Sequence, residues 1–141
     1  MDENLLQVCE YNDEGYRPLI DFNGWRVAIL NYIDDLHPRN NLRMERHCQT
    51  DEVFVLLRGR ATLIIGGNDP HTLEFLPQPM EFGKLYNVRQ KAWHTVLMTR
   101  DASILLVENT DTGESNSEYA QMPQSILREV QTLAKIEGFD D

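Results

Sequence analysis

The sequence is poor in several features that identify common protein classes. Only two of its 141 residues are cysteine, Cys9 and Cys48, and neither belongs to a CxxC pair, so neither a disulfide framework nor a thiol redox motif is expected. No apolar run approaches the length of a membrane span. The N-terminus is acidic and lacks the basic start and apolar stretch of a signal peptide. We therefore expect a cytoplasmic protein with no membrane partner.

Positive charge is also scarce. There are 13 basic against 23 acidic residues, and the net charge is −10. Such a field repels phosphate backbones, so nucleic acid is not an expected partner, and an anionic small molecule would need a local basic group. The chain has no Walker loop, no dinucleotide fingerprint and no GxSxG elbow, and no organic cofactor is implied.

Short β-rich segments fill the middle of the chain, with turn signals between them. Asn23-Gly24 separates residues 19–22 from residues 25–32, and this pair is typical of a type I′ hairpin turn, in which both residues have positive φ. Further strands are expected over residues 42–47, 52–57, 60–65, 72–76, 84–88, 93–98 and 103–108. Many short strands at regular spacing predict an all-β sandwich or barrel.

The C-terminal part has a different period. After the polar stretch 109–118, the apolar residues Ile126, Val130 and Leu133 form one stripe of a helix expected over residues 123–136. We expect this helix to cover the outer wall of the barrel or a dimer partner. The whole chain, residues 1–141, is expected to form one domain with a barrel core at about residues 19–110.

The candidate chemistry lies where two predicted strands meet. Glu45 and His47 share one face of the first strand by period-two alternation, and a short turn then begins the next strand at Glu52. His94 begins a later strand. Imidazole nitrogens and carboxylate oxygens together suit iron, manganese, nickel or zinc.

These residues also resemble the two sequence motifs of the cupin superfamily. His47, Glu52 and Gly59 fit the spacing of the first motif, and Gly83 and His94 fit the second. The resemblance covers roughly residues 40–110. It implies a cupin-like double-stranded β-helix, or jelly-roll barrel, followed here by the C-terminal α-helix.

The motifs are incomplete. The first histidine of the family's HxH pair is replaced by Glu45, so the implied metal ligands become Glu45, His47, Glu52 and His94. The positions of four further motif residues hold Arg39, Arg89, Lys91 and Met98. The alternative is that the buried histidines and glutamates only hydrogen-bond one another.

Side chains alternate between the two faces of a strand, so further residues of the same strands should share the inward face and line a substrate pocket. The expected lining residues are Arg43, Phe54, Leu56, Val96 and Met98. Arg43 would hold a substrate carboxylate or phosphate, or else be a structural partner for Glu45 or another buried acid. Trp93 and Cys48 are expected to face away from the pocket, and His37 and His71 are expected to be exposed.

Three functions remain open from the sequence. The first is a metal-dependent enzyme acting on a small metabolite, of oxygenase, isomerase or lyase type. The second is a metal-free module that binds or senses a small molecule. The third is a metal-free, sugar-type isomerase or epimerase that uses His47 or His94 as base. Because cupins are often dimers and sheet edges pair readily, we also expect a homodimer.

Overall fold

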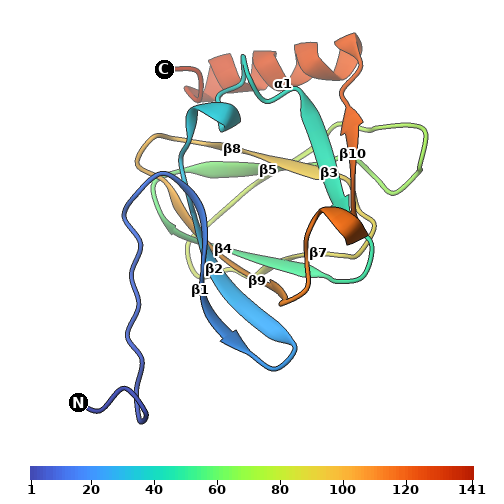
Figure 1. The fold of residues 1–141 in the computed structure, drawn as a ribbon. Coiled ribbons are helices and arrows are strands. Elements are labelled where there is room, and N and C mark those ends of the chain that lie inside the picture. The colour runs from blue at the N-terminus through green and yellow to red at the C-terminus, as the bar shows by residue number, and fades with distance from the viewer.

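Ten strands form two antiparallel sheets in the computed structural model, which describes residues 1–141 (Figure 1). In the first sheet the order is β1 (Gly15–Phe22), β2 (Trp25–Asn31), β9 (Ser103–Asn109), β4 (Glu52–Arg58) and β7 (Tyr86–Val88). In the second sheet it is β10 (Ser117–Gln121), β3 (Arg43–His47), β8 (His94–Met98), β5 (Ala61–Ile65) and β6 (Leu76–Pro79). Two short 3₁₀ turns, η1 (Asp34–Leu36) and η2 (Glu114–Asn116), and one helix, α1 (Gln124–Glu137), complete the chain. The predicted all-β architecture with a C-terminal helix is confirmed.

The sheets are held together by alternating apolar residues. In β4, Phe54 and Leu56 are buried and alternate with the half-buried Val53 and Val55. A cluster of 13 buried hydrophobic residues fills the space between the sheets. Burial of these side chains is the main favourable contribution to the stability of the barrel.

Helix α1 covers the outer face of the second sheet, as Figure 1 shows above β3, β5 and β8. It buries Ile126, Val130 and Ala134 in a second cluster of nine residues that includes Leu97 of β8. The helix ends at Gly138, whose φ of 74° is the left-handed conformation of a helix C-terminus. The predicted bounds are shifted by one residue, and no helix here has the length and apolarity that a membrane span requires.

Three local expectations are wrong. The strand expected over residues 72–76 begins only at Leu76 and includes both Pro77 and Pro79, which is tolerated because β6 is an edge strand. Strand β10 was not predicted, because it lies partly within the polar stretch. In the β1–β2 turn only Asn23 has positive φ, at 54°, so the type I′ expectation fails at Gly24.

Candidate functional site

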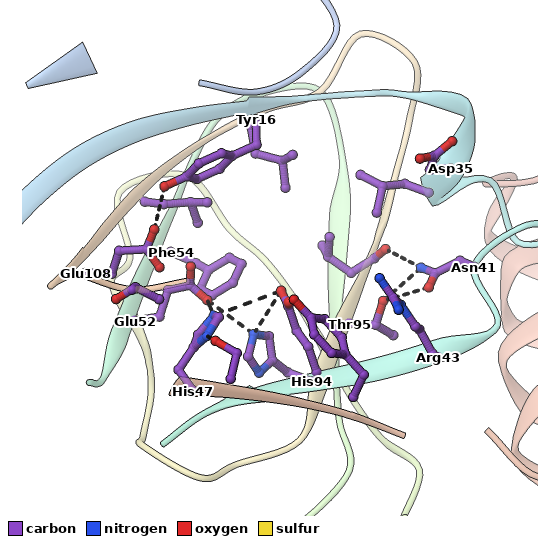
Figure 2. Close-up of a pocket in the computed structure, with 18 of the residues that line it drawn as sticks. Tyr16, Asp35, Asn41, Arg43, His47, Glu52, Phe54, His94, Thr95 and Glu108 are labelled. Atoms are coloured by element: carbon purple, nitrogen blue, oxygen red, sulfur yellow. Dashed lines mark hydrogen bonds and ion pairs between the residues drawn. The ribbon is translucent and has the colours of Figure 1, made fainter. Parts of the chain in front are cut away.

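The two sheets enclose a cavity of about 660 Å³ that is lined by all four predicted ligand residues. Figure 2 shows three of them, His47, Glu52 and His94, pointing toward one another. Glu45 and His47 come from β3 and His94 from β8, and Glu45 pairs with His94 in the register of these strands. Glu52 reaches the same place from β4 in the opposite sheet. The site is therefore assembled across the barrel from strands distant in sequence.

Glu52 is the centre of this group. Its Oε1 atom lies 3.2 Å from Nε2 of His47 and 3.2 Å from Nε2 of His94. Glu45 is farther away, with Oε1 at 4.0 Å from each of the same two nitrogens. Glu52, His47 and His94 are buried, whereas the side chain of Glu45 is 42% exposed, so Glu45 has room to move toward the other three.

The other ring nitrogens fix the orientation of both imidazoles. Nδ1 of His94 lies 3.0 Å from the carbonyl oxygen of Ala92, which only accepts, so Nδ1 carries the proton. Nδ1 of His47 lies 2.8 Å from Oγ of Ser117. Both rings therefore present Nε2 to Glu52. Nε2 of His47 is buried without a hydrogen-bond partner, because its contact with Glu52 lacks hydrogen-bond geometry.

Burial and charge oppose each other at these groups. Burial lowers the pKa of His47 and of His94, but the close contact and negative charge of Glu52, with that of Glu45, raise both values above the ordinary one. Burial likewise raises the pKa of Glu52, but the two imidazoles outweigh it and hold the pKa well below its usual range. At neutral pH Glu52 is therefore a carboxylate.

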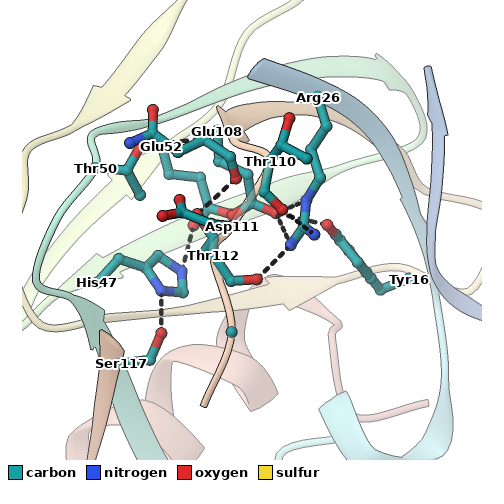
Figure 3. Close-up of polar contacts among 12 residues, drawn as sticks. Tyr16, Arg26, His47, Thr50, Glu52, Glu108, Thr110, Asp111, Thr112 and Ser117 are labelled. Carbon is teal, nitrogen blue, oxygen red and sulfur yellow. Dashed lines mark hydrogen bonds and ion pairs between the residues drawn. The ribbon is translucent and has the colours of Figure 1, made fainter. Parts of the chain in front are cut away.

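A second polar group, not predicted from the sequence, continues the site into the first sheet (Figure 3). Oε1 of Glu108 accepts from the Tyr16 hydroxyl at 2.5 Å and from Nε and Nη2 of Arg26 at 3.2 and 3.0 Å. Burial and the neighbouring Glu52 raise the pKa of Glu108, and burial with Glu108 raises that of Tyr16. Alternation along β9 would have found Glu108, since it shares a face with Leu106. Tyr16 lies before the predicted hairpin, and no sequence pattern indicated that it faces the cavity.

No family model matches the sequence, and no curated protein matches it. Several solved structures are similar to this chain in fold. Pac13 from Streptomyces, described as a unique nucleoside dehydratase, has a TM-score of 0.53 and 9% identity over 79% of this chain and 83% of its own. Rru_A2000 from Rhodospirillum rubrum, described as a cupin-2 domain, has a TM-score of 0.50 and 15% identity over 89% and 79%. The chain has the cupin fold. CapF from Staphylococcus aureus, a capsular polysaccharide assembling protein, has a TM-score of 0.55 and 9% identity over 86% of this chain and 34% of its own. Identities this low establish the fold alone.

The cavity extends less far along the strands than the predicted pocket lining assumed. Phe54 and Val96 line it, and the Phe54 ring stands nearly perpendicular to that of His94, at 82° with centroids 5.8 Å apart. Leu56 and Met98 do not line it, which corrects the prediction. They lie one step farther along the same faces, within the core between the sheets.

Arg43 lies at the cavity without an acidic partner. Its guanidinium stacks on Tyr119, with the carbon 4.2 Å from the ring centroid, and it forms no hydrogen bond or ion pair with the protein. The alternative that Arg43 pairs with Glu45 is therefore wrong for this structure. Tyr119, on β10, was also missed by the sequence analysis.

The remaining candidates lie outside the cavity. Trp93 packs under helix α1 and its indole donates to the carbonyl of Asp69 at 2.8 Å, as expected for a residue facing away. Cys48 is half-buried, and burial with nearby Glu118 raises the pKa of its thiol, which disfavours a nucleophile. His71 is exposed, but His37 is only 4% exposed and contacts the carbonyl of Asp140 at 3.2 Å, so its predicted exposure is wrong.

The donor atoms fit a divalent metal ion. Two groups have ligand atoms within 4.8 Å of one another, Glu45 with His47 and His94, and His47 with Glu52 and Glu108. Ligands about 2.0–2.2 Å from a tetrahedral ion lie roughly 3.3–3.6 Å apart. The 3.2 Å distances from Glu52 to the two imidazoles are close to this value, and the 4.0 Å distances from Glu45 to the same nitrogens would have to shorten by less than 1 Å. Glu45 and Glu52 belong to different groups, so an ion held by both would draw the two groups together. The unpartnered Nε2 of His47 is the atom such an ion would satisfy.

Proposed function

We propose that this cupin is an enzyme that binds a small polar metabolite in its cavity and holds a divalent metal ion with Glu45, His47, Glu52 and His94. The observation that carries the proposal is the buried, unpartnered Nε2 of His47 beside the carboxylate of Glu52.

The surroundings of the histidines support the same assignment. Histidines that bind metals usually donate the other ring nitrogen to a carbonyl or similar acceptor, and His94 and His47 have such contacts with Ala92 and Ser117. Iron, manganese, nickel and zinc all suit two imidazoles with carboxylates, and the set resembles that of non-haem Fe(II) sites. When bound, the ion would act as a Lewis acid on a substrate oxygen.

The rest of the cavity would position the substrate. Phe54 and Val96 form an apolar wall beside His94 that limits access of water to the reacting end. Arg43 offers free donors on the same strand face as Glu45, so we propose that it binds a carboxylate or phosphate of the substrate in bidentate fashion. The cavity is lined by more acidic than basic residues. An anionic substrate would therefore need both direct contact with Arg43 and the positive charge of the bound metal ion.

The first experiment is metal content by elemental mass spectrometry on protein purified without chelator or affinity tag. We expect about one ion per chain in the native protein and under about a tenth of that in His47→Ala/His94→Ala. The matched control is His71→Ala, which removes an exposed histidine away from the cavity and should retain the ion. Absence of metal from the native protein, even after reconstitution with Fe(II), Mn(II), Ni(II) and Zn(II), would sink the metalloenzyme proposal.

A second candidate is metal-free acid–base catalysis. It is favoured by the Glu52 carboxylate between two imidazoles of raised pKa, with Glu108 nearby, whose pKa is raised by burial and by the charge of Glu52. In a dehydration, one group would remove a proton from carbon while an imidazolium protonates the departing hydroxyl. Pac13, solved with uridine, provides a first substrate class to test.

The two candidates are separated by nucleoside turnover, followed by proton NMR on chelator-treated protein. Turnover that survives chelation and is lost in His47→Gln supports the metal-free enzyme. Turnover that returns only with an added ion supports the first proposal. Binding of a nucleoside with no turnover under either condition would instead indicate a small-molecule binding or sensing module.

A further inference from the structure

The protein holds the carboxylate of Glu108 by only one of its two oxygens. The Tyr16 hydroxyl and both Nε and Nη2 of Arg26 donate to Oε1 of Glu108 (Figure 3). No group of the protein donates to Oε2 of the same carboxylate. The side chain of Glu108 is 3% exposed and lines the cavity. Because buried carboxylate oxygens normally accept hydrogen bonds, Oε2 is a free acceptor for a ligand in this cavity.

Arg26 fixes the orientation of this carboxylate. Arg26 on β2 lies opposite Glu108 on β9 in the strand register. Its guanidinium also donates to the carbonyl of Thr110 at 3.0 Å through Nη1 and to that of Thr112 at 2.8 Å through Nη2. The positive charge of Arg26 therefore offsets that of Glu108, and the carboxylate is held in place by the protein. An acceptor positioned in advance lowers the entropic cost of binding a ligand.

Tyr16 supplies a second acceptor beside the first. Its hydroxyl proton is donated to Oε1 of Glu108 at 2.5 Å, so its oxygen can accept a hydrogen bond but has no further proton to donate. Tyr16 is 40% exposed and lines the cavity. Oη of Tyr16 and Oε2 of Glu108 are thus separated by one hydrogen bond and one carboxyl group. Such a pair of acceptors fits two donors on adjacent atoms of a ligand.

Charge and the nearby walls favour neutral donors. An ammonium group would gain little from a carboxylate whose charge Arg26 already offsets, and its burial would be costly. A hydroxyl donates a hydrogen bond without carrying a charge into the cavity. Leu30, Phe54 and Leu106 also line the cavity and provide apolar contacts for the C–H groups between hydroxyls. This combination of acceptors and apolar walls suits a polyhydroxylated carbon skeleton.

From these observations we infer that the substrate carries hydroxyls on two adjacent carbons, which donate to Oε2 of Glu108 and to Oη of Tyr16. The inference rests on the proposed function, since it assigns the diol to the substrate of the same cavity. In Figure 2, Glu108 and Tyr16 lie at one end of the site and Arg43 at the other, with the two histidines between them. A molecule with a diol at one end and an anionic group at the other would span the site.

Two sugar phosphates that differ by one hydroxyl test the inference. We expect native protein to bind D-ribose 5-phosphate at least about tenfold more tightly than 2-deoxy-D-ribose 5-phosphate in NMR titrations, because the deoxy compound has no vicinal diol and leaves an acceptor unpaired. Glu108→Gln and Tyr16→Phe should each reduce this preference to under about threefold. Tyr16→Phe removes one oxygen from a side chain that is 40% exposed, so it tests the inference even where Glu108→Gln fails to fold. The control is Tyr11→Phe, whose hydroxyl bonds to the carbonyl of Glu14 outside the cavity.

Several results would overturn the inference. They are equal binding of the two compounds by native protein, no binding of ribose 5-phosphate at millimolar concentration, or a preference that survives in both Glu108→Gln and Tyr16→Phe. Loss of the metal ion in Glu108→Gln would overturn it as well, because it would assign this carboxylate to the metal. The proposed function fails in a different way. Native protein without metal would sink the metalloenzyme proposal while the diol preference persists, and metal-loaded protein that binds both compounds equally would sink only the diol inference.

Discussion

Replacing Gly59 by alanine should destabilise this protein more than replacing Gly83, the other glycine that fits a cupin motif. Gly59 lies in the turn between β4 and β5 with a φ of 72°, where an L-residue costs about 1–2 kcal/mol. A Cβ atom there would also lie 2.5 Å from Cα and 2.7 Å from the backbone nitrogen of Ala102. Because this neighbour is backbone, relief requires the two turns to separate, at a further cost of about 1–3 kcal/mol.

Substitutions at two other glycines distinguish the backbone cost of a positive φ from the steric cost of the close contact. Gly83 has a φ of 80° but open space around its Cβ position, so Gly83→Ala should lose only the backbone term of about 1–2 kcal/mol. Gly24 has neither a positive φ nor a neighbour within 4 Å, so Gly24→Ala should change stability by less than about 1 kcal/mol. Gly59→Ala should lose about 2–5 kcal/mol in total.

Urea denaturation followed by circular dichroism measures all three variants on one scale. Near this chain length each kcal/mol also shifts Tm by about 3–4 °C. Equal losses for Gly59→Ala and Gly83→Ala would refute the reasoning, since they would show that the close approach to Ala102 contributes nothing.

Three further predictions concern the site and the helix. In chelator-treated protein, the raised pKa of His47 and His94 contributes stability that is fully present below their ordinary value of 6.5 and is lost as the pH rises through the raised values, while the lowered pKa of Glu52 contributes stability that is present above 4.5. Tm should therefore fall as the pH rises above 6.5, and a profile equally steep in His94→Gln would contradict this. Val130→Ala should cost about 2 kcal/mol in urea denaturation, because Val130 is fully buried under α1, whereas Ile136→Ala, at a position 74% exposed on the same helix, should cost under about 0.5 kcal/mol. Arg43→Gln should leave metal content unchanged and weaken binding of inorganic phosphate, measured by NMR titration, more than Arg17→Gln does.

Much of the fold was predictable because strand alternation is a local property. The period of two placed Glu45, His47, Glu52 and His94 on inward faces, and the structure brings them together. The same period correctly placed Leu56 and Met98 on the inward faces of their strands, but it did not show that they lie in the core beyond the end of the cavity. Where a cavity ends is decided by neighbouring strands, which a single strand's sequence does not reveal.

Other elements escaped prediction for identifiable reasons. Strand β10 is mostly exposed and polar, and it is a strand because it pairs with β3 along its whole length. Lys91 occupies the motif's inner glycine position and still adopts a φ of 68°, so the backbone turn is retained although the residue is not. The Lys91 amide there donates to the carbonyl of His47 at 2.7 Å, a long-range contact that outweighs local preference.

The polar groups of the cavity come from both sheets of the barrel. Glu52 and Glu108 belong to one sheet, and His47 and His94 to the other, so a molecule that touches both groups bridges the sheets. Such a molecule binds only the folded chain and adds about 2.7 kcal/mol of resistance to unfolding at a hundredfold excess over its Kd. The melting temperature of the protein therefore reports binding of such a molecule, and a metabolite library can be searched by thermal shift before the reaction is known.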